Sequence, residues 1–342
     1  MSRNEEARVR VGVVGATGAV GEVLLGLLEE REYPVSMLRP LASGRSAGSK
    51  IAFRGEEIEV VEAKPDAFDG LDLVFFAATG ALSRELAPEV ARRGAIAIDK
   101  SNTWRMDDDV PLVVPEVNPE AVDAHKGIIA GPNCTTIGCV LPLEAIHRAA
   151  GLESAVITTL QAVSGAGRDG IEELEAQQAA VARGEAPRPH VFAAPIVNNA
   201  VPLCETFRDD GYSTEEVKLL HETRKIMGLP ELRVAMTCVR VPVPVGHSAT
   251  MLLETTRPLD PSDARAALEA FPGVEVVDDV AHDAFPTPRD VAGRDEVLVG
   301  RVRRDLTSDR LWLWNVSDNL RKGAATNAVQ VAELLLERGH LG

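Results

Sequence analysis

The chain has 342 residues, enough for two domains of ordinary size, and its hydrophobic content of 45% supplies material for a sizeable core. A formal net charge of −16 argues against nucleic acid or an anionic membrane as the main partner, although local arginines can still bind a small anion. The sequence has no run of 18 apolar residues, no recognisable signal peptide and too few cysteines for a disulfide framework. We therefore expect a cytoplasmic protein without a membrane segment.

The first part of the chain alternates short apolar strands with amphipathic helices. The expected strands are Val9–Gly15, Pro34–Ser43, Leu71–Thr79 and Ala95–Asp99, and the expected helices are Ala19–Arg31 and Ala81–Gly94. Strands that are apolar throughout and alternate with helices predict a parallel sheet covered on both faces. The fold class is therefore α/β, beginning with a Rossmann-type dinucleotide-binding domain.

After residue 132 the pattern changes to longer strands and fewer helices. The expected helices are Thr136–Ala150, Gly170–Gly184 and Ser213–Met227, and the expected strands are Ser154–Val163, Leu232–Val243 and Ser248–Thr256. Residues 133–318 should form an α+β domain with a mixed or antiparallel sheet and its helices on one face. The amphipathic stretch Ser317–Gly339 should be helical, and residues 319–342 should return to complete the domain of residues 1–132.

A glycine-rich turn follows the first strand and opens the first helix. "GATGAVG" places Gly15, Gly18 and Gly21 where a tight turn and helix N–H groups can receive a pyrophosphate. The spacing is G-x-x-G-x-x-G rather than G-x-G-x-x-G, so a turn without a ligand remains the alternative. We expect a nicotinamide cofactor here.

The segment after the second strand indicates which nicotinamide cofactor binds. "LASGRSAGSK" contains Ser43, Arg45, Ser46 and Lys50 but no acid that could accept a hydrogen bond from a ribose 2′-hydroxyl. Cations and hydroxyls suit a 2′-phosphate, which favours NADP(H) over NAD. A solvated basic loop is the alternative.

Cys134, in "AGPNCTTIGC", is a candidate nucleophile. A metal site is weakly supported, because Cys139 is five residues away and no histidine is near. A buried core thiol is the more serious alternative. However, Cys134 follows the helix-breaking Gly-Pro-Asn and precedes a helical run, and a helix N-terminus stabilises a thiolate. It also lies at the predicted domain junction, where ligand clefts are common.

A thiolate in a nicotinamide enzyme indicates aldehyde chemistry, in which sulfur carries the acyl group and hydride moves to or from its carbon. A histidine should then manage protons. His247, in "VPVPVGHSAT", is the best of seven histidines because it lies between a proline-broken segment and a long strand. A purely structural histidine remains the alternative.

Together these motifs resemble the aspartate-semialdehyde dehydrogenase family over nearly the whole chain. They include "GATGAVG", "LASGRSAG", "VPLVVPEVN", "GPNCTT", "QAVSGAG", "EEVKLLHETRKI", "TCVRVPVPVGHS" and "DNLRKGAATNAVQ". The resemblance implies an NADP-binding domain followed by a dimerisation and catalytic domain. It implies NADPH-dependent reduction of L-aspartyl-4-phosphate to L-aspartate 4-semialdehyde with release of inorganic phosphate, a step in lysine, methionine and threonine synthesis. It also implies a homodimer or a dimer of dimers.

The resemblance assigns roles residue by residue. Cys134 would be the acylated nucleophile, His247 the general acid/base, and Gln161 an orienting residue for the acyl group. Arg240 would hold the substrate α-carboxylate and Glu215 the substrate ammonium, while Arg105, Asn133 and Lys218 would hold the phosphate. The implied cofactor-binding residues are Gly15, Thr17, Gly18, Ala19, Val20, Ser43, Arg45, Ser46, Ser164, Gly165 and Asn319. No metal is implied.

Two alternative functions stay open, and one residue differs from the usual family pattern. N-acetyl-γ-glutamyl-phosphate reductases use similar chemistry, but their substrate has no free amine and would not need Glu215. A catalytically silent paralogue would be expected to have lost Cys134 or His247. Family members often have asparagine where this chain has Lys100, which either strengthens phosphate binding or faces solvent.

Overall fold

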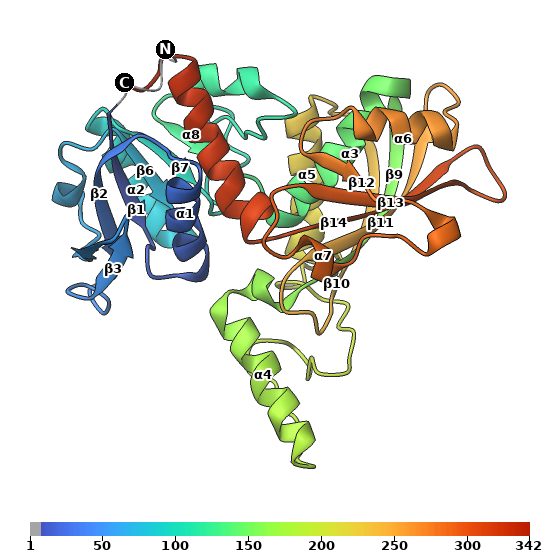
Figure 1. Cartoon of the computed structure of the whole chain (residues 1–342), viewed down its shortest axis with the longest axis horizontal. Helices are drawn as coiled ribbons and strands as arrows, with labels where there is room; N and C mark the ends of the chain where they lie inside the picture. Colours follow the sequence, from blue (N-terminus) through green and yellow to red (C-terminus); the bar gives the residue numbers. More distant parts are fainter. Residues whose placement is uncertain (1–7) are drawn as a thin grey trace. The chain divides into compact units, whose positions relative to one another are not determined.

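The computed structural model describes residues 8–342 (Figure 1). The chain forms two compact units. The first unit comprises the described residues up to Asn133 together with Ala324–Gly342, and the second unit comprises Cys134–Gly323. Each unit is built on one six-stranded sheet, and the expected α/β fold with a parallel and a mixed sheet is confirmed. The functional domain boundaries expected at 132/133 and 318/319 stay a prediction.

The sheet of the first unit is parallel throughout, with strand order β5-β2-β1-β6-β7-β8. Its strands are β1 (Val9–Val14), β2 (Val35–Ala42), β5 (Val61–Glu62), β6 (Leu73–Phe76), β7 (Ile96–Asp99) and β8 (Ile128–Ala130). Its helices are α1 (Ala19–Glu30), α2 (Gly80–Arg92) and α8 (Asn327–Glu337), with short 3₁₀ turns at η2 (Pro65–Phe68) and η3 (Pro119–Ala124). An antiparallel hairpin of β3 (Lys50–Phe53) and β4 (Glu56–Glu59) was not expected from the sequence.

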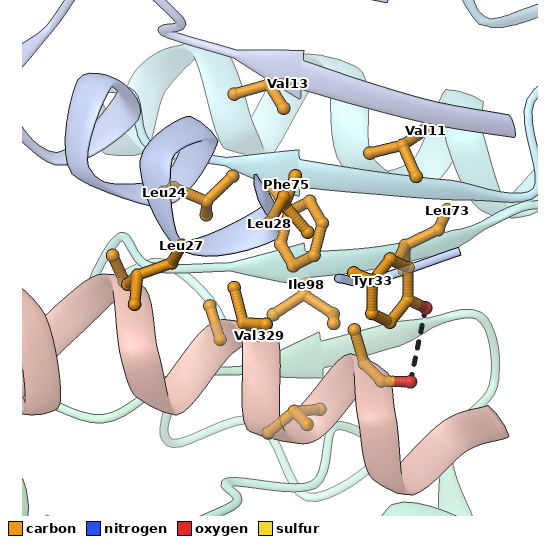
Figure 2. Close-up of a cluster of buried hydrophobic side chains, with 14 of the residues drawn as sticks. Val11, Val13, Leu24, Leu27, Leu28, Tyr33, Leu73, Phe75, Ile98 and Val329 are labelled. Atoms are coloured by element: carbon orange, nitrogen blue, oxygen red, sulfur yellow. Dashed lines mark hydrogen bonds between the residues drawn. The ribbon is translucent and has the colours of Figure 1, made fainter. Parts of the chain in front are cut away.

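Alternate residues of the parallel strands supply two separate cores. Val11, Val13, Leu73 and Phe75 pack with α1 and α8 on one face (Figure 2). Their neighbours Val14, Val74 and Phe76 pack with α2 on the other face. The continuous apolar runs are therefore explained by burial on both sides of the sheet. On the α8 side, the Tyr33 hydroxyl donates to the carbonyl of Ala332 over 3.3 Å (Figure 2).

The C-terminal segment is less regular than the sequence predicts. Ser317 still belongs to a strand, where it pairs with His247, and the Asp318 carboxylate then accepts N–H bonds from Leu320 and Arg321. A π-helix follows at η6 (Arg321–Thr326), and α8 begins only after it. The expectation of one helix over Ser317–Gly339 is wrong at its start, because strand pairing and the Asp318 turn compete with the helix.

The second unit contains a mixed sheet with order β10-β9-β11-β14-β13-β12. Its strands are β9 (Leu152–Gln161), β10 (Arg233–Arg240), β11 (His247–Thr255), β12 (Val274–Val276), β13 (Val297–Arg304) and β14 (Leu311–Ser317). The helices α3 (Cys134–Ala150), α5 (Thr214–Met227) and α6 (Pro261–Glu269) pack on the sheet. The remaining elements are η4 (Val163–Ala166), α4 (Arg168–Ala182), η5 (Val280–His282) and α7 (Pro288–Val291), and α4 projects away from the sheet (Figure 1).

No helix within residues 8–342 combines the length and the apolar character needed to cross a membrane.

Leu335 tests whether α8 is part of the first unit's core. Its side chain is 0% exposed in the cluster with α1, so Leu335→Ala should lower the free energy of unfolding by about 2–5 kcal/mol. Leu306→Ala is the matched control, because Leu306 is 100% exposed and its truncation should change stability little. Urea denaturation measures both variants, and equal stability of the two would contradict a structural role for α8.

Candidate active site

Three candidate residues lie at one edge of the second unit's sheet. Gln161 ends β9 and Arg240 ends β10, and the two are register partners in a parallel pair. His247 begins β11, which is antiparallel to β9, so its first residue lies at the same edge. All three side chains are buried. The strand directions, rather than closeness in sequence, therefore bring them together.

Cys134 is the first residue of α3, two positions earlier than the sequence predicts for the helix start. The first-turn N–H groups of a helix favour negative charge on a sulfur placed there. The backbone around Cys134 is tightly packed, since a Cβ added to Gly323 would lie 3.0 Å from the Cys134 Cβ. One turn further on, the Asn315 side chain donates to the carbonyl of Gly138 over 2.8 Å. These contacts fix the beginning of the helix against the C-terminal end of β14.

The Cys134 sulfur lies 3.4 Å from Nε2 of His247. The other ring nitrogen, Nδ1, accepts the backbone N–H of Ala162 over 3.0 Å. Because Nδ1 must offer a lone pair to that donor, the neutral imidazole carries its proton on Nε2, facing the sulfur. The geometry thus sets both the pairing with Cys134 and the tautomer of His247.

Burial and the nearby Arg240 guanidinium hold the pKa of His247 well below its usual range. The ring is 3% exposed, and Gly165 leaves room for it: a Cβ at Gly165 would lie 3.1 Å from Nε2 and 2.5 Å from Nη1 of Arg240. A proton on Nδ1 would also oppose the Ala162 N–H. His247 is therefore neutral at physiological pH.

The other three cysteines differ from Cys134 in their surroundings. Cys134 is half-buried, whereas Cys139, Cys204 and Cys238 are buried and no cysteine of the chain forms a disulfide. Burial raises the pKa of the Cys204 thiol to about 12 and also raises the pKa of Cys139 and Cys238. Those three thiols are core residues.

Glu215 is a buried carboxylate that links several candidate residues. It is 3% exposed and accepts hydrogen bonds from the Thr135 hydroxyl over 3.2 Å and the Gln161 amide over 3.1 Å. Lys218 lies one helical turn away, with its ammonium 3.9 Å from the Glu215 carboxylate. Glu205 also pairs with the Lys218 ammonium. Lys218 is therefore held between two carboxylates.

Arg240 presents an unsatisfied donor. Its Nη1 donates to the carbonyl of Ala162 over 2.7 Å, and its guanidinium lies 5.9 Å from the ring centre of Phe192. Its Nε is buried and has no hydrogen-bond partner among the described residues. A buried N–H without an acceptor is costly, so this arrangement suits an anionic ligand that supplies one.

Three of the expected cofactor residues cluster in the same unit. The Asn319 amide donates to the Ser164 hydroxyl over 2.9 Å, and its oxygen accepts the Gly246 N–H, one residue before His247. Gly165 follows Ser164 in η4 and packs beside the His247 ring. The structure therefore brings Ser164, Gly165 and Asn319 to the vicinity of His247.

The glycine-rich turn lies in the first unit, between β1 and α1. Gly15 has φ +84°, and a Cβ there would lie 2.3 Å from the carbonyl oxygen of Ala77. A Cβ on Gly21 would lie 2.2 Å from the Gly15 oxygen. Gly18 is the N-cap of α1, and Thr17, Ala19 and Val20 flank it with partly exposed surfaces. The tight turn leaves the helix N-terminus accessible to a phosphate.

Other expected residues of the first unit follow strand ends. Ser43 and Arg45 are exposed in the turn after β2, where the Ser46 N–H donates to the Ser43 carbonyl. Arg105 and Asn133 are both 7% exposed. Arg105 donates through Nε to the carbonyl of Gly131 over 3.0 Å.

Sequence reasoning missed three contributors to this site. The Ala162 backbone has no side-chain signal at all, and Glu205 is joined to Lys218 only by the fold. Thr135 could have been noticed, because it directly follows Cys134. Within residues 8–342, no group of three or more His, Cys, Asp or Glu side chains could hold a metal.

Comparison with known proteins agrees with this geometry. Residues 10–125 match the family model "Semialdehyde dehydrogenase, NAD binding domain", and residues 143–322 match "Semialdehyde dehydrogenase, dimerisation domain". The aspartate-semialdehyde dehydrogenase of Aquifex aeolicus is 49% identical over 96% of this chain and 98% of its own length. The chain belongs to the aspartate-semialdehyde dehydrogenase family. The family's reaction, EC 1.2.1.11, serves aspartate-family amino-acid biosynthesis, and the family and enzyme class expected from the sequence are confirmed.

Two solved structures extend the comparison. Aspartate semialdehyde dehydrogenase II from Vibrio cholerae, complexed with ASA, has a TM-score of 0.94, with 44% identity over 96% of this chain and 98% of the other. The Candida albicans enzyme with NADP has a TM-score of 0.75, with 28% identity over 96% of this chain and 98% of the other. The first unit thus contains an NAD(P)-binding domain. The roles assigned to single residues stay predictions.

The tautomer of His247 can be measured directly. In ¹⁵N-labelled protein, we expect the His247 imidazole to remain neutral with its proton on Nε2 from pH 8 to below about 6.5, the ordinary pKa of histidine. A His247→Gln variant assigns the signals. A titration midpoint near the ordinary value, or a proton on Nδ1, would contradict the geometry.

Proposed function

We propose that this chain catalyses the NADPH-dependent reductive dephosphorylation of L-aspartyl-4-phosphate to L-aspartate 4-semialdehyde through a thioester on Cys134. The observation that carries the proposal is the 3.4 Å pairing of the Cys134 sulfur with Nε2 of His247 at the start of a helix. Membership of the family and the ASA bound to the Vibrio cholerae relative support the choice of substrate.

The first step needs only the sulfur and a phosphate-binding group. The Cys134 thiolate attacks the acyl carbon, the carbon–oxygen bond to phosphate breaks, and inorganic phosphate leaves with the electron pair. The reduced nicotinamide, when bound, supplies a hydride to the acyl carbon held on the sulfur. The sulfur then leaves with its electron pair and is again a thiolate. The cycle therefore begins and ends with the same protonation state at Cys134.

His247 serves this cycle as a hydrogen-bond donor. Its Nε2–H faces the sulfur and can stabilise negative charge on the thiolate or on an oxygen of the group that the sulfur carries. Full transfer of that proton would leave an anionic ring, because Nδ1 is engaged by the Ala162 N–H. From the sequence, His247 was expected to be a general acid/base. We propose instead that it donates a hydrogen bond through Nε2–H and transfers no net proton.

Two buried groups of opposite charge match the ends of the amino acid. The Arg240 guanidinium, with its unsatisfied Nε, suits the α-carboxylate. The Glu215 carboxylate, oriented by Thr135 and Gln161, suits the ammonium. An N-acetylated substrate has no ammonium to stabilise a buried carboxylate, which disfavours the N-acetyl-γ-glutamyl-phosphate alternative.

We assign the phosphate to Arg105, Asn133 and Lys218. Of these, Lys218 already pairs with Glu205 and Glu215, so part of its charge is balanced within the protein. Arg105 donates to backbone carbonyls of Lys100 and Gly131, which orient its guanidinium. A planar guanidinium can hold two phosphate oxygens at once.

The turn between β1 and α1 fits the pyrophosphate of NADP(H). The backbone at Gly15 and Gly21 is packed so closely that no side chain would fit. Gly18, the N-cap of α1, leaves the first-turn N–H groups accessible to a ligand. Thr17, Ala19 and Val20 would flank the pyrophosphate. Ser43, Arg45 and Ser46 would hold the 2′-phosphate, and Ser164, Gly165 and Asn319 would bind the nicotinamide portion. The NADP bound to the Candida albicans relative supports the phosphorylated cofactor.

We propose that a second copy of the chain covers the outer face of the second unit's sheet. Val156, 46% exposed on this face, is the register neighbour of Leu252, which in turn lies beside Trp312. Trp314 adds a second partly exposed indole. An apolar row of this kind favours a homodimer, in keeping with the matched dimerisation domain. A dimer of dimers and the cytoplasmic location stay predictions.

Cys134→Ala should abolish turnover. The assay follows NADP reduction in the presence of aspartate semialdehyde and phosphate, and kcat should fall at least about a thousandfold because no thioester can form. Cys204→Ala removes a buried core thiol of the same unit, whose raised pKa disfavours a thiolate, and should retain kcat. Retained activity in Cys134→Ala would exclude the nucleophile, and a preference for the N-acetylated glutamate semialdehyde would exclude the proposed substrate.

Arg45→Glu should selectively weaken the binding of NADP(H) relative to NAD(H). Loss of a charge-assisted bond and introduction of a repelling carboxylate should raise KM for NADP by about 10–100-fold, with little effect on NAD. The turn that carries Arg45 already has one acidic neighbour, because Oε1 of Glu62 lies 3.1 Å from a Cβ built on Gly44. Arg92→Glu, at the exposed last residue of α2, is the control for net charge. An unchanged ratio of NADP to NAD use would refute the 2′-phosphate site.

A further inference from the structure

Lys100 occupies a position at the carboxyl edge of the parallel sheet. It directly follows β7, and the adjacent strand β8 continues into Gly131, Pro132 and Asn133. Asp99 and Ala130 are register partners at the ends of these two strands, so Lys100 and Gly131 leave the sheet side by side. Ligands of open α/β sheets bind outside this edge.

The Lys100 side chain is fitted to the neighbouring segment. A Cβ built on Gly131 would lie 2.8 Å from Cδ and 3.3 Å from Nζ of Lys100, so the lysine side chain passes directly over Gly131. The ammonium then donates to the carbonyl of Pro132 over 2.9 Å. The positive charge is thereby held beside the residue that precedes Asn133.

Arg105 is attached to the same segment. Its Nε donates to the carbonyl of Gly131, and its Nη2 donates to the carbonyl of Lys100 over 2.8 Å. Lys100 and Arg105 thus bond to consecutive carbonyl oxygens, those of Pro132 and Gly131. Two cations on one short segment repel each other, and an anionic ligand offsets that cost.

The carboxylate of Asp99, at the start of this turn, is engaged locally. Asp99 accepts from the backbone N–H of Ser101 over 3.1 Å and from its hydroxyl over 2.6 Å. Burial raises the pKa of Asp99, while Arg105 acts against that rise. The turn from Asp99 to Arg105 is therefore already ordered before any ligand binds.

We propose that Lys100 is a second cation of the phosphate subsite and acts beside Arg105 on the inorganic phosphate that leaves or attacks the acyl group. The inference rests on the proposed function, which assigns Arg105 and Asn133 to phosphate. Inorganic phosphate is a mixture of mono- and dianion at neutral pH, so a second cation strengthens its binding. In this role Lys100 strengthens the binding of phosphate and does not affect the binding of aspartate semialdehyde or of the cofactor.

The test compares wild type with Lys100→Gln and Lys100→Met in the NADP-reducing direction. Gln retains an N–H donor for the Pro132 carbonyl but loses the charge, whereas Met loses both. Both variants should raise KM for inorganic phosphate about tenfold or more, with kcat and KM for aspartate semialdehyde near wild type. Lys100→Arg should restore most of the phosphate affinity. Lys126→Gln, an exposed lysine paired with Asp109 in the same unit, is the control.

A second readout does not depend on turnover. Inorganic phosphate at constant ionic strength should raise the Tm of wild type and of Lys126→Gln, and raise it less in Lys100→Gln and Lys100→Met. A wild-type KM and Tm response to phosphate in both Lys100 variants would overturn the proposal. So would a fall of kcat in Lys100→Met alone with an unchanged phosphate KM, since Lys100 would then only position the Pro132 carbonyl. Absence of phosphate-dependent turnover in wild type would instead refute the proposed function.

Discussion

The peptide groups of Ala162 hold two side chains of the site in place, the neutral His247 imidazole and the charged Arg240 guanidinium. Its N–H donates to Nδ1 of His247, and its carbonyl accepts from Nη1 of Arg240. One buried residue just beyond β9 therefore sets the tautomer of the imidazole and the position of the guanidinium. Because Arg240 also lowers the pKa of His247, the group that orients the guanidinium helps to keep the histidine neutral. The proposed chemistry depends on this one backbone position remaining fixed.

Much of the fold could be predicted from the sequence because burial leaves a periodic pattern. The strands around Val11 and Phe75 are apolar at every position because both faces are covered, and that run is visible without a structure. Cys134 was identifiable for a similar local reason, since Gly-Pro-Asn stops one segment and a helix starts after it. The start of the C-terminal helix was predicted wrongly because the Asp318 turn and the π-helix leave the hydrophobic periodicity intact.

What the sequence could not supply are contacts made by backbone groups and by residues far apart in the chain. The family resemblance named Gln161, Glu215 and Lys218. The Thr135 bond to Glu215 arises only when α5 packs beside α3, and the Glu205 pairing with Lys218 arises only when the segment before α5 folds back onto that helix. These contacts also change how strongly a residue such as Lys218 can bind a ligand. A lysine between two carboxylates is a weaker anion site than an isolated one, because bound phosphate must compete with charges already present.

In a strongly acidic protein, it matters whether a cation is paired with carboxylates or is held by neutral groups. At a net charge of −16, the average field repels an acyl phosphate or inorganic phosphate, so its binding depends on cations that are fixed close to it. Backbone carbonyls meet this need: they fix the direction of a guanidinium or ammonium without supplying a full negative charge. Arg105 is oriented in this way, whereas Lys218 is oriented by carboxylates. Within the proposed phosphate site, Arg105 is therefore the stronger group, and Lys218 contributes less because it also balances the buried charge of Glu215.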